Sequence, residues 1–151
     1  MGREGADALY RALVAAARDP AWYVEAGIPD TVDGRFDMIA AFVALALNRI
    51  GEGDRKGAAL LIEAFIADMD GNLRQLGVGD LKVGKEVARL VGALGGRSAT
   101  LKEALAEGDL EGWAERNLFR GTPPDKGAPT RAAKRLREAS EKSPLQQQGR
   151  I

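Results

Sequence analysis

Apolar residues recur along most of the chain at spacings of three and four, which is the period of an amphipathic helix. The segment 61–76 is a clear case, because its apolar positions keep this spacing throughout. Alternation of apolar and polar residues is nearly absent, and β-branched residues are few, which argues against strands. The pattern predicts an all-α fold, a compact single-domain bundle of about six to seven helices. We expect these helices over residues 6–18, 21–26, 34–50, 55–76, 81–94, 101–106 and 110–119.

Capping and stop signals set the predicted ends of these helices. A side-chain oxygen just before a helix can accept a hydrogen bond from a free backbone N–H of the first turn. Residues with such an oxygen precede three of the predicted helices: Asp54, Asp80 and Asp109. Thr100, followed three residues later by Glu103, reads as a capping box. Gly95-Gly96 is predicted to end the helix over 81–94.

The segment 34–50 is predicted to lie at the centre of the core. From Met38 to Leu47 it is apolar around much of its circumference, unlike a surface helix with one apolar face. Phe36, Met38 and Met69 are also expected in the core. The acids Asp33 and Asp37 share a face in the first helical turn, where negative charge suits the helix dipole, so a structural role is favoured over catalysis.

The character of the chain changes after Gly121. Residues 122–129 are rich in Pro and Gly and predict a linker, residues 130–142 predict a short helix, and residues 143–151 predict disorder. Residues 1–119 hold 14 basic and 19 acidic side chains, whereas residues 120–151 hold 8 basic and 3 acidic ones. The formal net charge of zero is therefore the sum of an acidic part and a basic part. We expect a helical domain over 1–121 and a basic, partly disordered tail over 122–151.

Two residue types are missing, and their absence excludes many functions. The chain has no His and no Cys, so the usual zinc, iron–sulfur and disulfide sites cannot form, and neither can a Ser-His-Asp triad. We predict no catalytic residue, no metal and no cofactor. No apolar stretch of about 18 residues occurs, and no signal-peptide pattern is evident, which predicts a cytoplasmic protein of bacterial type.

Two motifs resemble ligand-binding loops but lack required residues. Gly79–Glu86 matches the phosphate-loop spacing, yet Glu86 stands where Ser or Thr should ligate Mg²⁺. The segment starting at Asp68 begins like a calcium loop, yet Leu73 and Gly79 occupy the positions of the required Gly and Glu. We therefore interpret the first motif as a turn between helices, and the acids of the second as solvated or partner-facing.

A set of short motifs spread over residues 8–121 resembles the ubiquinol–cytochrome c chaperone family. Each motif is weak alone, but their order and spacing are specific. They are Leu9-Tyr10, Ala12–Val14, Pro20, Tyr23, Val32–Met38, Ala67–Asp70, Leu73-Arg74, Gly77–Asp80, Val83–Lys85, Gly96-Arg97 and Arg116–Gly121.

This resemblance implies an all-helical, non-enzymatic assembly factor. Members of the family bind newly made cytochrome b and assist assembly of the respiratory ubiquinol–cytochrome c reductase. The chain resembles the bacterial single-domain members, which implies work in the cytoplasm or at the inner face of the inner membrane. Many relatives carry His where Phe42 stands here, and they continue after Gly121 with a more apolar helix.

Family-like polar residues around one helix–turn–helix are our candidates for contacts with a client or partner. They are Asp68, Asp70, Arg74, Asp80 and Lys85. Caps and interhelical salt bridges are the alternative role for these side chains.

A second function remains open from the residues alone. The basic cluster Arg131, Lys134, Arg135 and Arg137 is either a solubilising element or a docking surface for nucleic acid, ribosome or an anionic membrane. The alternative to an assembly chaperone is thus a helical adaptor, or a nucleic-acid- or ribosome-associated protein, that docks through its basic C-terminal tail. No specific DNA binding is expected.

Overall fold

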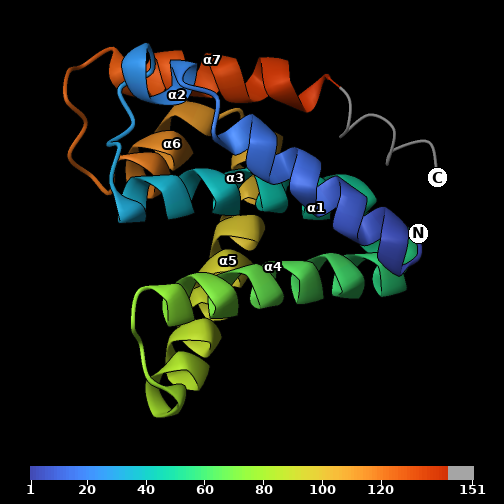
Figure 1. The fold of residues 1–151 in the computed structure, drawn as a ribbon. Coiled ribbons are helices and arrows are strands. Elements are labelled where there is room, and N and C mark those ends of the chain that lie inside the picture. Colours follow the sequence, from blue (N-terminus) through green and yellow to red (C-terminus); the bar gives the residue numbers. More distant parts are fainter. Residues whose placement is uncertain (143–151) are drawn as a thin grey trace.

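The computed structural model describes residues 1–142 and shows an all-α protein, as predicted from the sequence (Figure 1). No strand occurs in this part of the chain. The predicted disorder of residues 143–151 lies outside the described residues. The helices are α1 (Arg3–Ala17), α2 (Ala21–Val24), α3 (Val32–Ile50), α4 (Arg55–Gln75), α5 (Asp80–Glu107), α6 (Leu110–Leu118) and α7 (Ala128–Ser140), with a 3₁₀ turn η1 (Gly51–Asp54) between α3 and α4.

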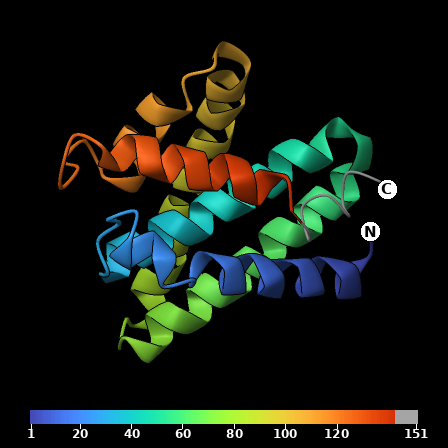
Figure 2. The same ribbon diagram turned by 90° about the horizontal axis from the view of Figure 1, so that it is seen from above.

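Helix α3 forms the centre of the core, as its apolar pattern predicts. All residues from Met38 to Ala46 are buried. Helices α1, α4, α5 and α6 all contact α3, and Figure 2 shows α3 passing between the other long helices. Phe42, at the position where relatives often carry His, packs edge to face on Trp22 with ring centroids 5.7 Å apart. Phe42 is therefore a core side chain in this protein.

Three helices begin at side-chain caps. The carboxylates of Asp54 and Asp109 each accept a hydrogen bond from the backbone N–H three residues later, at 2.8 and 3.1 Å, as predicted. Helix α3 begins in the same way, because Thr31 Oγ1 accepts from the N–H of Gly34 at 3.0 Å. The predicted cap at Asp80 is wrong: Gly79 occupies the cap position without a side-chain bond, and Asp80 pairs with Arg74 instead.

The predicted break at Gly95-Gly96 is also wrong, because α5 runs through both glycines as one helix of 28 residues. Glycine costs only about 1 kcal/mol in a helix interior, which packing can offset. Here Leu90, Leu94 and Leu101 continue one buried stripe across the glycines. Thr100 does not cap a new helix, since its hydroxyl donates to the Gly96 carbonyl. The expected helix over 101–106 is thus the end of α5.

Helix α7 packs against α6 and joins the same core cluster as α3. Its predicted range, 130–142, is shifted by two residues toward the C-terminus relative to the observed range, Ala128–Ser140. The buried side of α7 carries mainly small residues: Ala128, Pro129, Ala132, Ala133 and Leu136. The Pro- and Gly-rich segment 122–127 therefore connects two packed helices. The division of the chain into a domain over 1–121 and a basic tail stays a prediction.

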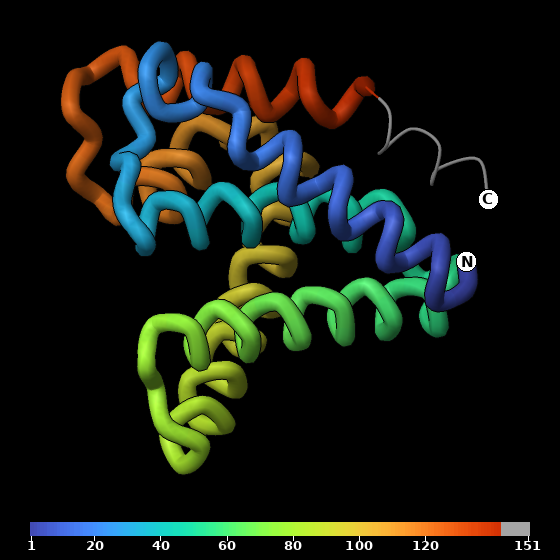
Figure 3. Tube along the Cα trace, viewed as in Figure 1, coloured from blue at the N-terminus to red at the C-terminus, as the bar shows by residue number. Residues whose placement is uncertain are grey.

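The turn between α4 and α5 lies far from α6 and α7. The chain trace shows this hairpin projecting at the end of the molecule opposite α7 (Figure 3). Gly77 in the turn has a φ of +86°, a conformation that glycine adopts without strain. Within residues 1–142, none of the helices combines the length and the hydrophobicity of a membrane span.

Candidate functional site

An open groove of about 1060 Å³ lies between α2, the first turns of α3 and the α4–α5 hairpin. Its apolar lining includes Val24, Val32 and Leu76, which are 82%, 66% and 65% exposed. Large aliphatic side chains with this exposure are unusual when they gather in one concave surface, and such surfaces commonly bind partners. Deeper apolar residues continue the lining: Phe36, Ile39, Met69, Leu73, Leu90 and Ala93.

The polar residues of the groove carry an excess of positive charge. Five arginines line it, against three acidic residues: Arg18, Arg35, Arg89, Arg97 and Arg120, with Asp30, Asp33 and Glu86. Two of the acids are each paired with an arginine of the same surface, Asp30 with Arg35 at 2.8 Å and Glu86 with Arg89 at 3.0 Å. The third acid, Asp33, pairs with Arg120 at 3.3 Å near Arg97, where α3 and α5 meet, whereas Arg18 stands at the C-terminal end of α1.

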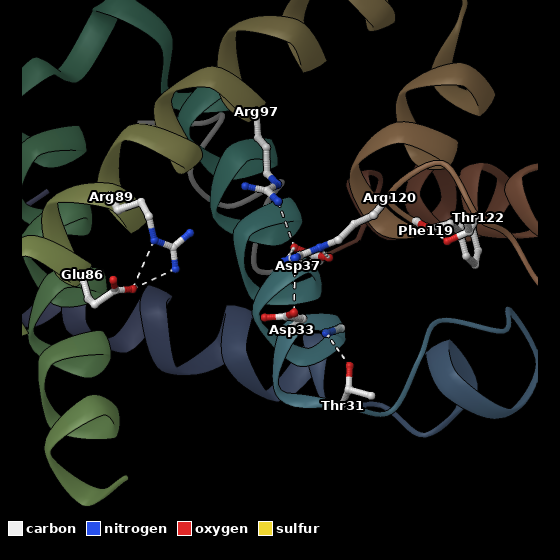
Figure 4. A network of polar contacts seen from close by, with 10 residues as sticks. Thr31, Asp33, Asp37, Glu86, Arg89, Arg97, Phe119, Arg120 and Thr122 are labelled. Atoms are coloured by element: carbon white, nitrogen blue, oxygen red, sulfur yellow. Dashed lines mark hydrogen bonds and ion pairs between the residues drawn. The ribbon is translucent and has the colours of Figure 1, made fainter. Parts of the chain in front are cut away.

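Two of these arginines meet one buried carboxylate, Asp37 of α3 (Figure 4). Asp37 is only 2% exposed, and within residues 1–142 it is the one charged residue that is buried. Arg97 of α5 donates from Nη2 to Asp37 Oδ1 at 2.9 Å. Arg120 donates from Nε to Oδ2 at 2.9 Å and from Nη2 to Oδ1 at 3.1 Å. This Asp37 cluster ties α3, α5 and the chain after α6 together.

Burial and neighbouring charge act differently on the two arginines. Arg97 is 15% exposed, and burial lowers the pKa of its guanidinium, while Asp37 opposes that effect. Its guanidinium also lies over the Phe36 ring, 5.4 Å from the centroid, in a cation–π contact. The hydrogen bonds from Arg120 to Asp37 raise the pKa of Arg120. Because arginine side chains stay protonated in proteins, Asp37 faces two positive charges.

Local backbone geometry holds Arg120 in position. Arg120 has a φ of +49°, within residues 1–142 the one non-glycine residue with a positive φ, and Gly121 follows with +80°. These two left-handed residues turn the chain away from α6, where the Thr122 N–H and hydroxyl both donate to the Phe119 carbonyl, at 2.9 and 3.1 Å (Figure 4). A left-handed conformation is costly for a side-chain-bearing residue, so the Asp37 contacts offset a local strain.

The five predicted contact residues lie elsewhere. Arg74 pairs with Asp70 at 2.7 Å and also with Asp80, so these three form one surface cluster at the α4–α5 hairpin. Asp68 accepts a hydrogen bond from the Tyr10 hydroxyl at 2.5 Å. Lys85 is exposed and forms no ion pair with another described residue. None of the five lines the groove, and their role as client contacts stays a prediction.

Sequence reasoning missed the Asp37 cluster, although each of its members stands in one of the quoted motifs. Asp37 lies in Val32–Met38, Arg97 in Gly96-Arg97 and Arg120 in Arg116–Gly121. The available signal was the position of Asp37 directly before the uncharged run 38–47, where a carboxylate must find a cation if it is buried.

The two loop-like motifs do not form ligand sites in this structure. Residues 80–86 are the first turns of α5, and Asp68 and Asp70 lie within α4. In the part of the chain that the structure describes, no three acidic side chains gather in a way that could hold a metal ion. What the molecule offers instead is an apolar groove lined by arginines, two of which surround Asp37.

Comparison with known proteins connects this fold to a family. The chain is similar over 99% of its length to the crystal structure of the Cbp3 homolog from Brucella abortus, with a TM-score of 0.74 and 28% sequence identity, and the match covers 88% of that chain. No curated protein matches the sequence. The family model described as ubiquinol–cytochrome C chaperone matches residues 24–141, which include the groove-lining part of α3 and the whole Asp37 cluster. The chain therefore belongs to the ubiquinol–cytochrome c chaperone family.

Proposed function

We propose that this protein is a non-enzymatic assembly chaperone that holds newly made cytochrome b, through the groove, during assembly of ubiquinol–cytochrome c reductase. Family membership supports the assembly role. The groove is the single observation that favours this location for the client, because it gathers exposed aliphatic side chains beside arginines. A client of this kind consists of apolar helices with polar ends, and an apolar helix can lie in a hydrophobic groove.

The exposed rim supplies part of the free energy that client binding requires. Full burial of a Val or Leu side chain is worth about 1.5–3 kcal/mol. Val24, Val32 and Leu76 are already partly buried, so together they would contribute on the order of 3–6 kcal/mol when covered. Association itself costs several kcal/mol. These three side chains alone do not outweigh that cost, so the deeper apolar lining, such as Phe36 and Leu73, must also contribute to a transient complex.

Site-specific photo-crosslinking tests this location. A photoreactive amino acid at Val24 or Val32 should capture cytochrome b in cells that are translating it, since both side chains lie on the groove rim. The matched control is Leu105, which is 47% exposed but does not line the groove. Equal capture from Leu105, or no cytochrome b peptide from either groove position, would contradict the proposed site. Deletion of the gene should also lower assembled reductase and leave other respiratory complexes mostly intact.

Under this proposal the protein works in the cytoplasm, at the inner face of the bacterial inner membrane where the client is made. The exposed part of α7 favours a second, compatible contact. Lys134 and Arg137 are exposed and form no ion pair with another described residue, whereas Arg131 is held by Asp125 and Arg135 by Glu25. Free basic side chains on one helix suit an anionic surface such as ribosomal RNA or lipid headgroups.

Neutralising this basic surface tests the second contact. Lys134→Gln with Arg137→Gln should weaken sedimentation with ribosomes and reduce its dependence on salt. Unchanged sedimentation would contradict docking through α7.

A further inference from the structure

The Asp37 cluster has more positive than negative charge. Asp37 faces two guanidinium groups, and both of its oxygens already accept hydrogen bonds. Arg97 Nε is buried and has no hydrogen-bond partner among the described residues. Of the two guanidinium groups, Arg120 is 48% exposed, so it is the one that a further anion entering the groove can reach.

The nearest additional anion in the chain is held weakly. Asp33 Oδ2 lies 3.3 Å from Arg120 Nη1, in a pair whose side chains are 74% and 48% exposed. Exposed pairs of this kind contribute little, because water screens them and competes for both partners. Arg120 keeps Asp37 through Nε and Nη2, so Nη1 is the donor that can change its partner. A carboxylate entering the groove can replace Asp33 there without disturbing the buried bonds.

We propose that the segment bound in the groove carries an acidic residue just beyond its apolar stretch, and that this carboxylate binds Arg120 Nη1 in place of Asp33. The inference rests on the proposed function, since it assumes that the groove holds a client helix. It adds a rule of selection: apolar helices with an acidic flank are preferred over equally apolar helices with neutral or basic flanks. Charge complementarity at the groove supports this, because its five arginines still outnumber its three acids and the buried Asp37 taken together.

Two labelled helical peptides of the same apolar sequence provide the test. One has Glu on both flanks and the other has Gln at the same positions, and binding to the full chain is measured by fluorescence anisotropy. We expect the Glu peptide to bind about fivefold more tightly at low salt, as a partly exposed ion pair allows. The ratio should fall towards one at about 0.5 M salt.

Asp33→Asn separates the specific contact from general attraction. It removes the internal competitor, so the Glu peptide should bind about threefold more tightly while the Gln peptide is unchanged. Asp30→Asn is the matched control, because it makes the same charge change on the same rim but leaves Arg120 untouched. It should leave the ratio between the peptides unchanged. Both variants are at exposed positions, so they are expected to fold.

The outcomes distinguish the two proposals. If neither peptide binds, the groove is not a site for apolar helices, and both proposals are overturned. If the Glu and Gln peptides bind with the same affinity, both to the unaltered protein and to Asp33→Asn, the groove remains a client site and the preference for an acidic flank is wrong. If Asp30→Asn enhances the Glu peptide as much as Asp33→Asn does, the preference comes from the net charge of the groove and the role of Arg120 is wrong.

Discussion

Replacing Asp37 by Asn should be among the most damaging conservative changes in this protein. The substitution keeps the size of the side chain but removes the negative charge that Arg97 and Arg120 share. Arg97 is 15% exposed, so water cannot fully take over the role of the lost carboxylate. Removing one partner of a buried ion pair typically costs about 3–5 kcal/mol.

The structure places the expected loss near the lower end of that range. Arg120 is 48% exposed and can turn to solvent, so its share is small, at most about 1 kcal/mol. Arg97 keeps its contact with the Phe36 ring, which retains part of its stabilisation. We therefore expect a loss of about 3 kcal/mol. For a chain of this length that lowers Tm by about 6–12 °C.

Urea denaturation followed by circular dichroism measures this loss, and the fluorescence of Trp22 and Trp113 provides a second probe of the core. Asp33→Asn is the control, because Asp33 contacts the same Arg120 but is 74% exposed, and it should cost less than about 1 kcal/mol. The double variant Asp37→Asn with Arg97→Gln should lose less than the sum of the two single variants, since the charges act on each other. A loss for Asp37→Asn no larger than that for Asp33→Asn would refute the reasoning.

Three further predictions concern the fold. Gly34→Ala should lower the free energy of unfolding by more than about 2 kcal/mol, because a Cβ there would lie 1.8 Å from a backbone carbonyl oxygen of the preceding loop. Gly71→Ala should raise the free energy of unfolding by about 0.5–1 kcal/mol, because nothing lies within 4 Å of its Cβ position. Leu136→Ala should cost about 2–5 kcal/mol in urea denaturation, because the Leu136 side chain is fully buried in the core cluster; a loss within about 0.5 kcal/mol would contradict the packing of α7. Burial and the bond to Asp68 raise the pKa of Tyr10 above its usual 10.0, so the folded state keeps a proton that the unfolded state loses. Stability should thus be full below pH 10 and fall above it, and Tyr10→Phe should flatten that fall; an unchanged slope would contradict the assignment.

Periodicity predicted the helices well because packing in this fold follows local pattern. The caps at Asp54 and Asp109 come from interactions within a few residues, and the central position of α3 shows in the sequence as a helix that is apolar around most of its circumference. The predicted helix end at Gly95-Gly96 was wrong, because each glycine destabilises a helix by only about 1 kcal/mol. The tertiary packing of the buried leucines on either side offsets this cost.

The candidate site was harder to predict from the sequence. Arg97 and Arg120 lie 60 and 83 positions after Asp37 in the sequence, so no local pattern connects the three residues. Arg74 and Asp70, two of the residues expected to make contacts, do lie together. Their proximity could be predicted, because residues four positions apart on one helix are neighbours. The groove depends on the angles at which the helices cross, and the pattern of a single sequence does not determine those crossing angles.

The four glycines of α5 have a mechanical consequence for the groove. Gly84, Gly92, Gly95 and Gly96 have no atom within 4 Å of where a Cβ would stand, so no neighbour requires them to be small. Glycines make a helix easier to bend, and three of these lie together between the two halves of α5. One half of α5 forms a groove wall with α4, while the other is anchored against α6. Bending at 92–96 would change the width of the groove, but it would also shift the buried side chains of Leu90, Leu94 and Leu101 relative to one another, so the packing of this stripe holds the groove at one width.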